Sequence, residues 1–143
     1  MLSKRFLISW LASSVVMFIL FYVWHGLFLT DFARLSYPKE IFLIFSALVY
    51  LIIGFVVSKA IDTKLLENVF KRNSLLKGLI SGAVCGFGFF LMATVVGVSF
   101  SAGSRIQNLL LDVSWQVIEQ AIGGLVVGIV HVFVFDPATI FGD

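Results

Sequence analysis

The sequence predicts an all-α membrane protein with four transmembrane helices. Of its 143 residues, 60% are hydrophobic and only 13% are charged, whereas soluble proteins are about 25% charged. The mean hydropathy is +1.08, and the apolar residues form long blocks. Because about 20 apolar residues cross the hydrocarbon core as one helix, this composition excludes a soluble domain. We therefore expect residues 1–143 to form a single transmembrane domain.

Four apolar blocks mark the predicted spans. The first, 6–29, follows a basic start, but it is too long for the apolar region of a secretory signal and no Ala-x-Ala-like cleavage site follows it. We expect it to remain as an anchor. The other three blocks are 41–61, 79–100 and 113–135. The segment 62–77 spaces apolar and charged residues like an amphipathic helix, which predicts a short element at the membrane surface.

The basic residues predict the orientation of the chain. Seven flank one side of the predicted membrane: Lys4, Arg5, Lys59, Lys64, Lys71, Arg72 and Lys77. Three flank the other side: Arg34, Lys39 and Arg105. The excess on one side predicts that both termini are cytoplasmic, in a multi-pass protein of a bacterial inner membrane. No basic run is dense enough to indicate a nucleic-acid partner, so the lipid bilayer is the expected surrounding.

Short words recur between the two halves of the chain. Residues 7–9 and 79–81 both read Leu-Ile-Ser, and 53–57 resembles 123–127. Two helical hairpins in the same orientation, as in the parallel repeats of some transporters, would explain the likeness. Apolar spans also share such words by chance, so the repeat stays an open alternative.

Small residues at intervals of four predict close helix packing. They lie on the second, third and fourth spans: Gly54, Gly78, Gly82, Gly86, Gly124 and Gly128. Such strips let two helix backbones approach each other. The spacing does not distinguish packing within one chain from packing between chains, so a homo-oligomer or a complex with other membrane subunits is expected as one alternative.

A polar stripe runs along the fourth span. Its members recur at steps of three and four: Asp112, Trp115, Gln116, Glu119, Gln120, Gly123, Gly124, Gly128 and His131. A charged side chain at a helix centre costs about 2.5–3.5 kcal/mol even on the most lenient scale. We therefore expect Glu119 to face the bundle, a cavity or a partner.

The first span offers partners for this stripe at its outer end. By helical rise, His25 and Gln116 lie about 6 Å from the outer boundary, and Tyr22 and Glu119 roughly 10 Å. If the first and fourth spans are neighbours, a cluster of polar side chains forms there: Tyr22, His25, Gln116, Glu119 and Gln120. Asp31 and Asp112 are expected at its mouth.

This predicted cluster has two interpretations. It can be structural, with Glu119 hydrogen-bonded between helices and the tryptophans at the interface. It can also be a site for a proton, an ion or a small solute, in which Glu119 binds or relays and His25 titrates near neutral pH.

Catalytic and cofactor signatures are missing from the sequence. There is no Gly-x-Ser-x-Gly, no His-Glu-x-x-His, no P-loop lysine and no cysteine pair. Cys85 has small or apolar neighbours and is expected to be an inert thiol. A bis-histidine haem needs two imidazoles at one depth, whereas His25 and His131 are expected near opposite surfaces. We expect no catalytic residue, no metal and no cofactor.

The end of the first span carries a resemblance to known proteins. Trp24-His25-Gly26, in a four-helix chain of this size, resembles uncharacterised small bacterial inner-membrane proteins with Trp-Tyr-Gly or Trp-His-Gly at that place. The resemblance implies the four-helix layout and no particular activity. Two functional hypotheses follow from the residues: a non-enzymatic, self-associating unit or accessory subunit of a membrane complex, and a small channel or carrier using the polar stripe.

Overall fold

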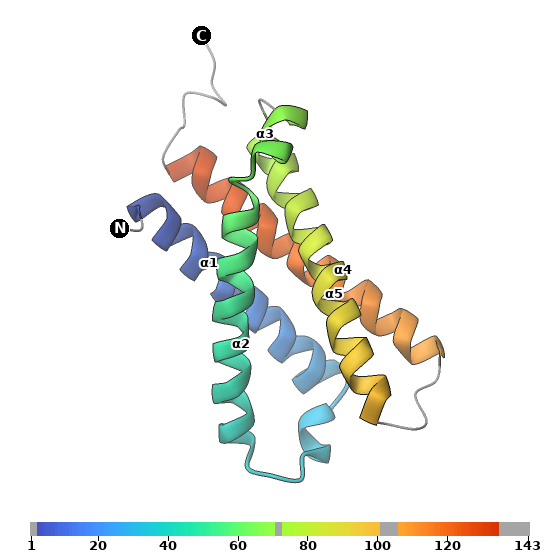
Figure 1. The fold of residues 1–143 in the computed structure, drawn as a ribbon. Helices are drawn as coiled ribbons and strands as arrows, with labels where there is room; N and C mark the ends of the chain where they lie inside the picture. The colour runs from blue at the N-terminus through green and yellow to red at the C-terminus, as the bar shows by residue number, and fades with distance from the viewer. Residues whose placement is uncertain (1–2, 71–72, 101–105, 135–143) are drawn as a thin grey trace.

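Helices form almost all of the protein in the computed structural model, which describes residues 3–70, 73–100 and 106–134 (Figure 1). In chain order they are α1 (Lys4–Phe21), the π-helical η1 (Tyr22–Phe28), the 3-10 turn η2 (Asp31–Arg34), α2 (Lys39–Ala60), α3 (Lys64–Val69), α4 (Ser74–Phe100), α5 (Ile106–Ile129) and the π-helical η3 (Val130–Val134). No strand occurs in these described ranges. The all-α prediction is therefore confirmed.

Four of these helical stretches are long and apolar enough to cross a membrane: Lys4–Phe28, Lys39–Ala60, Ser74–Ala93 and Leu109–Val134. Their number confirms the four predicted spans, and by length and composition the chain is a multi-pass membrane protein. Phe135, the last residue of the predicted fourth span, lies outside the described residues, as do Lys71, Arg72 and Arg105.

The boundary between the second loop and the third span differs from the prediction. Only Lys64–Val69 forms the separate short helix α3, with Leu65 80% exposed. α4 begins at Ser74, five residues before the predicted start, because the Asn73 side chain accepts a hydrogen bond from the Leu76 N–H at 3.1 Å and caps the helix. The predicted amphipathic segment 62–77 is therefore divided between α3 and the first turn of α4.

The chain passes back and forth through the bundle (Figure 1). At one end, here called the α3 end, α1 begins, α2 ends, α3 lies, α4 begins and η3 ends. At the other, the η2 end, η1 and η2 connect α1 to α2. α1 packs against both α2 and α5, and α4 packs mainly against α5.

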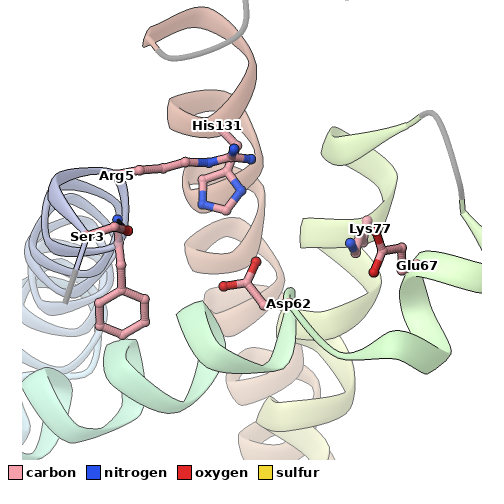
Figure 2. Close-up of a pocket in the computed structure, with 7 residues that line it drawn as sticks. Ser3, Arg5, Asp62, Glu67, Lys77 and His131 are labelled. Atoms are coloured by element: carbon pink, nitrogen blue, oxygen red, sulfur yellow. Dashed lines mark hydrogen bonds between the residues drawn. The ribbon is translucent and has the colours of Figure 1, made fainter. Parts of the chain in front are cut away.

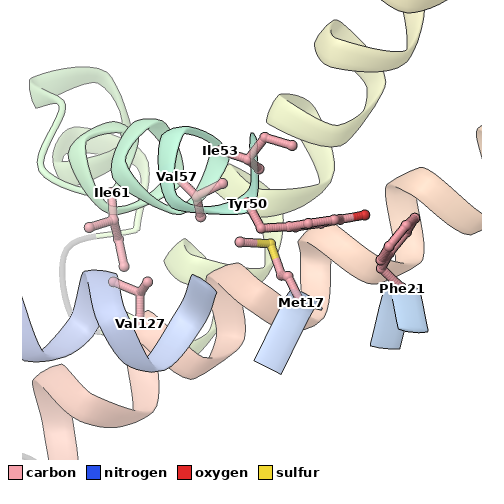
Figure 3. Packing of buried hydrophobic residues seen from close by; sticks show 7 residues of the cluster. All are labelled: Met17, Phe21, Tyr50, Ile53, Val57, Ile61 and Val127. Atoms are coloured by element: carbon pink, nitrogen blue, oxygen red, sulfur yellow. The ribbon is translucent and has the colours of Figure 1, made fainter. Parts of the chain in front are cut away.

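Two kinds of packing hold the bundle together. Between α1, α2 and α5 lies a core of apolar side chains (Figure 3): Met17, Phe21, Tyr50, Ile53, Val57, Ile61 and Val127. Between α4 and α5 the backbones themselves meet, because Gly78 faces Gly124 and Gly82 faces the Gln120 carbonyl. The predicted small-residue strips therefore join helices within one chain. Gly54 of α2 likewise packs against the Ser14 side chain of α1.

Several buried serine hydroxyls form hydrogen bonds inside this apolar bundle, whereas those of Ser58 and Ser81 have no partner among the described residues. Ser9, Ser14 and Ser46 each donate to the carbonyl four residues earlier at 2.8 Å. Ser13 instead donates across the interface, to the Gly123 carbonyl of α5 at 2.8 Å. These hydrogen bonds matter because an unpaired polar group costs free energy where no water reaches it.

Candidate functional site

The first and fourth spans are direct neighbours, as the predicted polar cluster requires. Besides the Ser13–Gly123 hydrogen bond, the rings of Trp24 in η1 and Trp115 in α5 are stacked, with centroids 4.3 Å apart and planes 9° from parallel. One interpretation of the sequence has both tryptophans as interfacial aromatic residues. In the structure they form one aromatic contact that joins the two spans near the η2 end.

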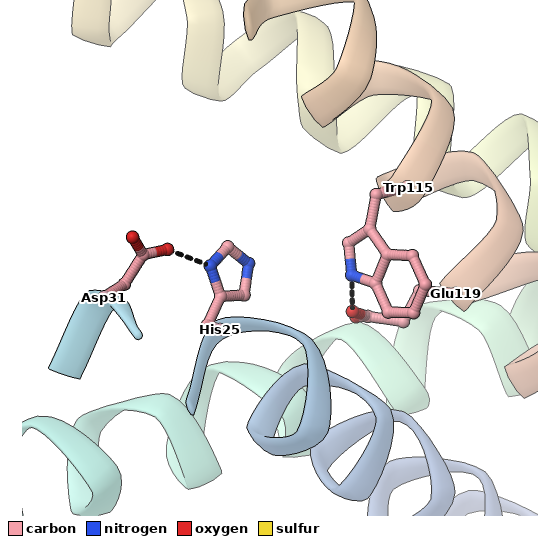
Figure 4. Close-up of polar contacts among 4 residues, drawn as sticks. All are labelled: His25, Asp31, Trp115 and Glu119. Atoms are coloured by element: carbon pink, nitrogen blue, oxygen red, sulfur yellow. Dashed lines mark hydrogen bonds and ion pairs between the residues drawn. The ribbon is translucent and has the colours of Figure 1, made fainter. Parts of the chain in front are cut away.

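Glu119 lies at the centre of the bundle and is 0% exposed. The Trp115 indole N–H donates to its Oε2 at 2.9 Å (Figure 4). Tyr50, a buried residue of α2, also interacts with this carboxyl group. The second oxygen, Oε1, has no hydrogen-bond partner among the described residues. Glu119 thus has a fixed orientation and one acceptor left free.

Gln120 points towards α4 and is also 0% exposed. A Cβ atom added at Gly86 would lie 3.1 Å from the Gln120 Cβ, and the Gln120 backbone carbonyl faces Gly82. Neither the amide nitrogen nor the amide oxygen has a hydrogen-bond partner in the part of the chain that the structure describes. Two neighbouring residues of α5 therefore hold three buried, unpartnered polar atoms.

A second polar group lies at the η2 end. The His25 Nδ1 and Asp31 Oδ2 atoms are 2.8 Å apart (Figure 4), and both side chains are partly exposed. Thr30 turns the chain between them with a left-handed φ of 53°, which brings η2 back against η1. Asp112 of α5 is close enough to interact electrostatically with both. Asp31 and Asp112 thus lie beside His25 at the η2 end.

The structure does not bring all the predicted cluster residues together. Tyr22 accepts a hydrogen bond from Lys39 Nζ at 3.4 Å and packs on Phe32, away from Glu119. Gln116 is half-buried, and its carbonyl faces Gly86. Tyr22 and His25 both lie in the π-helical η1, where hydrogen bonds run from residue i to i+5, so residues three apart are rotated further from each other than in an α-helix.

Both histidines of the chain lie in π-helical segments. His25 is in η1, at the end of the first span, and His131 is in η3, at the end of the fourth. They occupy opposite ends of the bundle, as predicted from their depths. π-helical turns are rare and are frequent at functional sites, so both ends of the α1–α5 pair hold a functional candidate.

Sequence reasoning missed two features of this arrangement. Tyr50 is a partner of Glu119, but a tyrosine within an apolar span has the same pattern as a packing residue. His131 lines a pocket with charged residues from other helices, and no local spacing connects those residues. The sequence signal for this pocket was that charged residues flank all four predicted spans on the same side of the membrane.

Comparisons with known proteins add no functional assignment. The chain matches no protein-family model, and no curated protein or solved structure is significantly similar to it. The buried side chains of Glu119 and Gln120 are therefore the main indication of function.

Proposed function

We propose that this protein is a small carrier that moves protons or a small polar solute across the membrane, with Glu119 as the binding group. The observation that carries the proposal is the set of three buried polar atoms without partners, Glu119 Oε1 and both amide atoms of Gln120. Buried polar atoms are nearly always hydrogen-bonded, and an ionisable residue inside a membrane is a functional candidate by default. A bound proton or solute would supply the missing partners.

The polar groups along α5 support movement towards both membrane surfaces. By helical rise, Asp112 lies about 10 Å from Glu119 on one side, and His131 about 18 Å on the other. Between Glu119 and His131, the Ser13 hydroxyl is bonded to Gly123 and Val127 is fully buried. Because this second stretch is closed by packed side chains, the arrangement favours a carrier that changes conformation over an open channel.

The donor set around Glu119 favours a proton or a neutral polar solute over a metal cation. Trp115 approaches the carboxyl group as an N–H donor, and a cation would be repelled by such a hydrogen. Hard cations also need six or more oxygen ligands, whereas Tyr50 is the one side-chain hydroxyl that interacts with Glu119 in the described ranges. In the proposed orientation the α3 end faces the cytoplasm of a bacterium, following the basic residues.

Replacing Glu119 tests the proposal. In proteoliposomes with an imposed pH gradient and a pH-sensitive dye inside, the wild-type chain is expected to dissipate the gradient. Glu119→Gln should reduce that rate at least tenfold, because the amide cannot bind and release a proton. Glu40→Gln is the matched control, since Glu40 is exposed at the start of α2. Equal rates for wild type and Glu119→Gln, with intact fold, would contradict the proposal.

A second candidate is the self-associating unit or accessory subunit. One observation favours it: an apolar groove of about 370 Å³ on the outside of α1 and α2, lined by Trp10, Leu48, Leu51, Ile52 and Phe55. A groove of this composition fits an apolar helix of a second chain. This candidate predicts a particle heavier than one chain in mild detergent, measured by light scattering. A purely monomeric particle would count against it.

A further inference from the structure

A charged pocket of about 400 Å³ lies at the α3 end, far from Glu119 (Figure 2). Its polar lining comes from segments far apart in the sequence: Ser3, Arg5, Asp62, Glu67, Lys77 and His131. The buried ring of Phe6 forms an apolar wall. Since α1, the α2–α3 turn, α3, α4 and η3 all contribute, the pocket depends on the assembled fold.

The charges around this pocket are balanced but not paired with one another. Arg5 and Lys77 are basic, and Asp62 and Glu67 are acidic, yet no ion pair joins any two of these four side chains. In Figure 2, Arg5 extends towards His131 from α1 and Asp62 from the turn after α2, whereas Glu67 and Lys77 lie across from them. Two positive and two negative groups therefore surround one space that a ligand could fill.

His131 provides an independent observation that points to a ligand. The residue is only 7% exposed, no hydrogen bond joins its ring to another described residue, and its ring nitrogens are not among the polar atoms closed off from solvent. Its ring lies within electrostatic range of Arg5, Asp62 and Lys77. A buried imidazole normally has a partner for its N–H. The group that completes the hydrogen bonding of His131 would have to occupy the pocket.

The depth of the pocket matches the lipid headgroup layer. The four apolar stretches begin or end at Lys4, Ala60, Ser74 and Val134. Arg5, Asp62, Lys77 and His131 each lie within three residues of one of these limits. Basic pockets between helices at this level bind the phosphate-containing headgroups of lipids, and Arg5 and Lys77 supply two basic groups here.

We propose that this pocket binds a phosphoethanolamine group. Arg5 and Lys77 would hold the phosphate, since guanidinium and ammonium groups form strong hydrogen bonds with phosphate oxygens, and the His131 N–H would donate to it. Asp62 and Glu67 would accept hydrogen bonds from the ammonium end. A simple anion would face the two carboxylates, and a simple cation the two basic groups. No described set of three His, Cys, Asp or Glu residues has the geometry of a metal site.

Lipid binding to the purified full-length chain tests this proposal. Native mass spectrometry would measure retention of short-chain phosphatidylethanolamine, phosphatidylcholine and phosphatidylglycerol, and a parallel titration would use soluble phosphoethanolamine. We expect phosphatidylethanolamine to be retained best, because the choline headgroup has no N–H donors and the glycerol headgroup no positive charge. Retention of the lipid but not the soluble compound would identify a membrane source, whereas binding of the soluble compound alone would identify a cytosolic one.

Three substitutions connect the binding to the pocket. Arg5→Gln should weaken binding about tenfold, because a charge-assisted hydrogen bond to phosphate is lost. Lys64→Gln removes the same charge from an exposed residue of α3 that does not line the pocket, and should have no effect. Asp62→Asn should shift the preference towards phosphatidylglycerol. Equal retention of the three lipids with no soluble binding, or equal effects of Arg5→Gln and Lys64→Gln, would overturn the proposal.

Discussion

Gly82→Leu is expected to disrupt the α4–α5 interface and to lower the free energy of unfolding by about 3 kcal/mol or more. A Cβ atom at Gly82 would collide with the Gln120 carbonyl oxygen and come within 2.8 Å of its carbonyl carbon. These are backbone atoms, so no side-chain rotation can relieve the contact. The leucine could be accepted only if one helix moves away, which would also separate Gly78 from Gly124.

Gly88→Leu is the matched control for this substitution. Gly88 is on the same helix, and a Cβ atom there would meet nothing within 4 Å. Because glycine is a poor helix former, Gly88→Leu should leave the stability unchanged or raise it slightly. Thermal unfolding in detergent, followed by circular dichroism, measures both variants. Equal destabilisation by the two substitutions would show that the loss of stability does not come from the contact with α5.

The glycine strips show which part of the packing could be predicted from sequence. Spacing of four places Gly78, Gly82 and Gly86 on one face of a helix, and that face was predicted. The partner was not, because spacing describes one helix and contains no information on which neighbour approaches it. In the structure α5 packs against this face. The glycine strip, for which contacts within and between chains were both open, therefore makes its contacts within one chain.

For the polar residues, the depth of a side chain in the membrane could be predicted from the sequence, whereas its direction around the helix axis could be predicted only in part. Depth follows from counting residues at a constant rise, and the cost of a charged group facing lipid correctly predicted that Glu119 faces the bundle. Direction around the axis depends on the helix type, and the π-helical turn at Tyr22 changes it. The lining of the charged pocket was beyond prediction, since Arg5, Asp62 and His131 are far apart in sequence.

Gln120→Met is expected to raise the stability of the protein and to reduce its transport. The wild-type amide is 0% exposed and lacks hydrogen-bond partners among the described residues. An unsatisfied buried polar group costs about 1–3 kcal/mol, and methionine has a similar size and adapts to irregular spaces. We therefore expect the free energy of unfolding to rise by about 1–3 kcal/mol. The proteoliposome rate should fall, because the bound solute or proton-carrying water loses two polar partners.

Gln116→Met provides the comparison, since Gln116 is one turn earlier on α5 and only half-buried. It should change neither stability nor transport appreciably. The combination of higher stability with lower transport is informative because a purely structural glutamine cannot produce it. If Gln120→Met lowered the stability, the amide would have a partner in the folded protein. If it raised the stability but left transport unchanged, the ligand would bind at Glu119 without Gln120. Unfolding and transport measured on the same preparation distinguish these three outcomes.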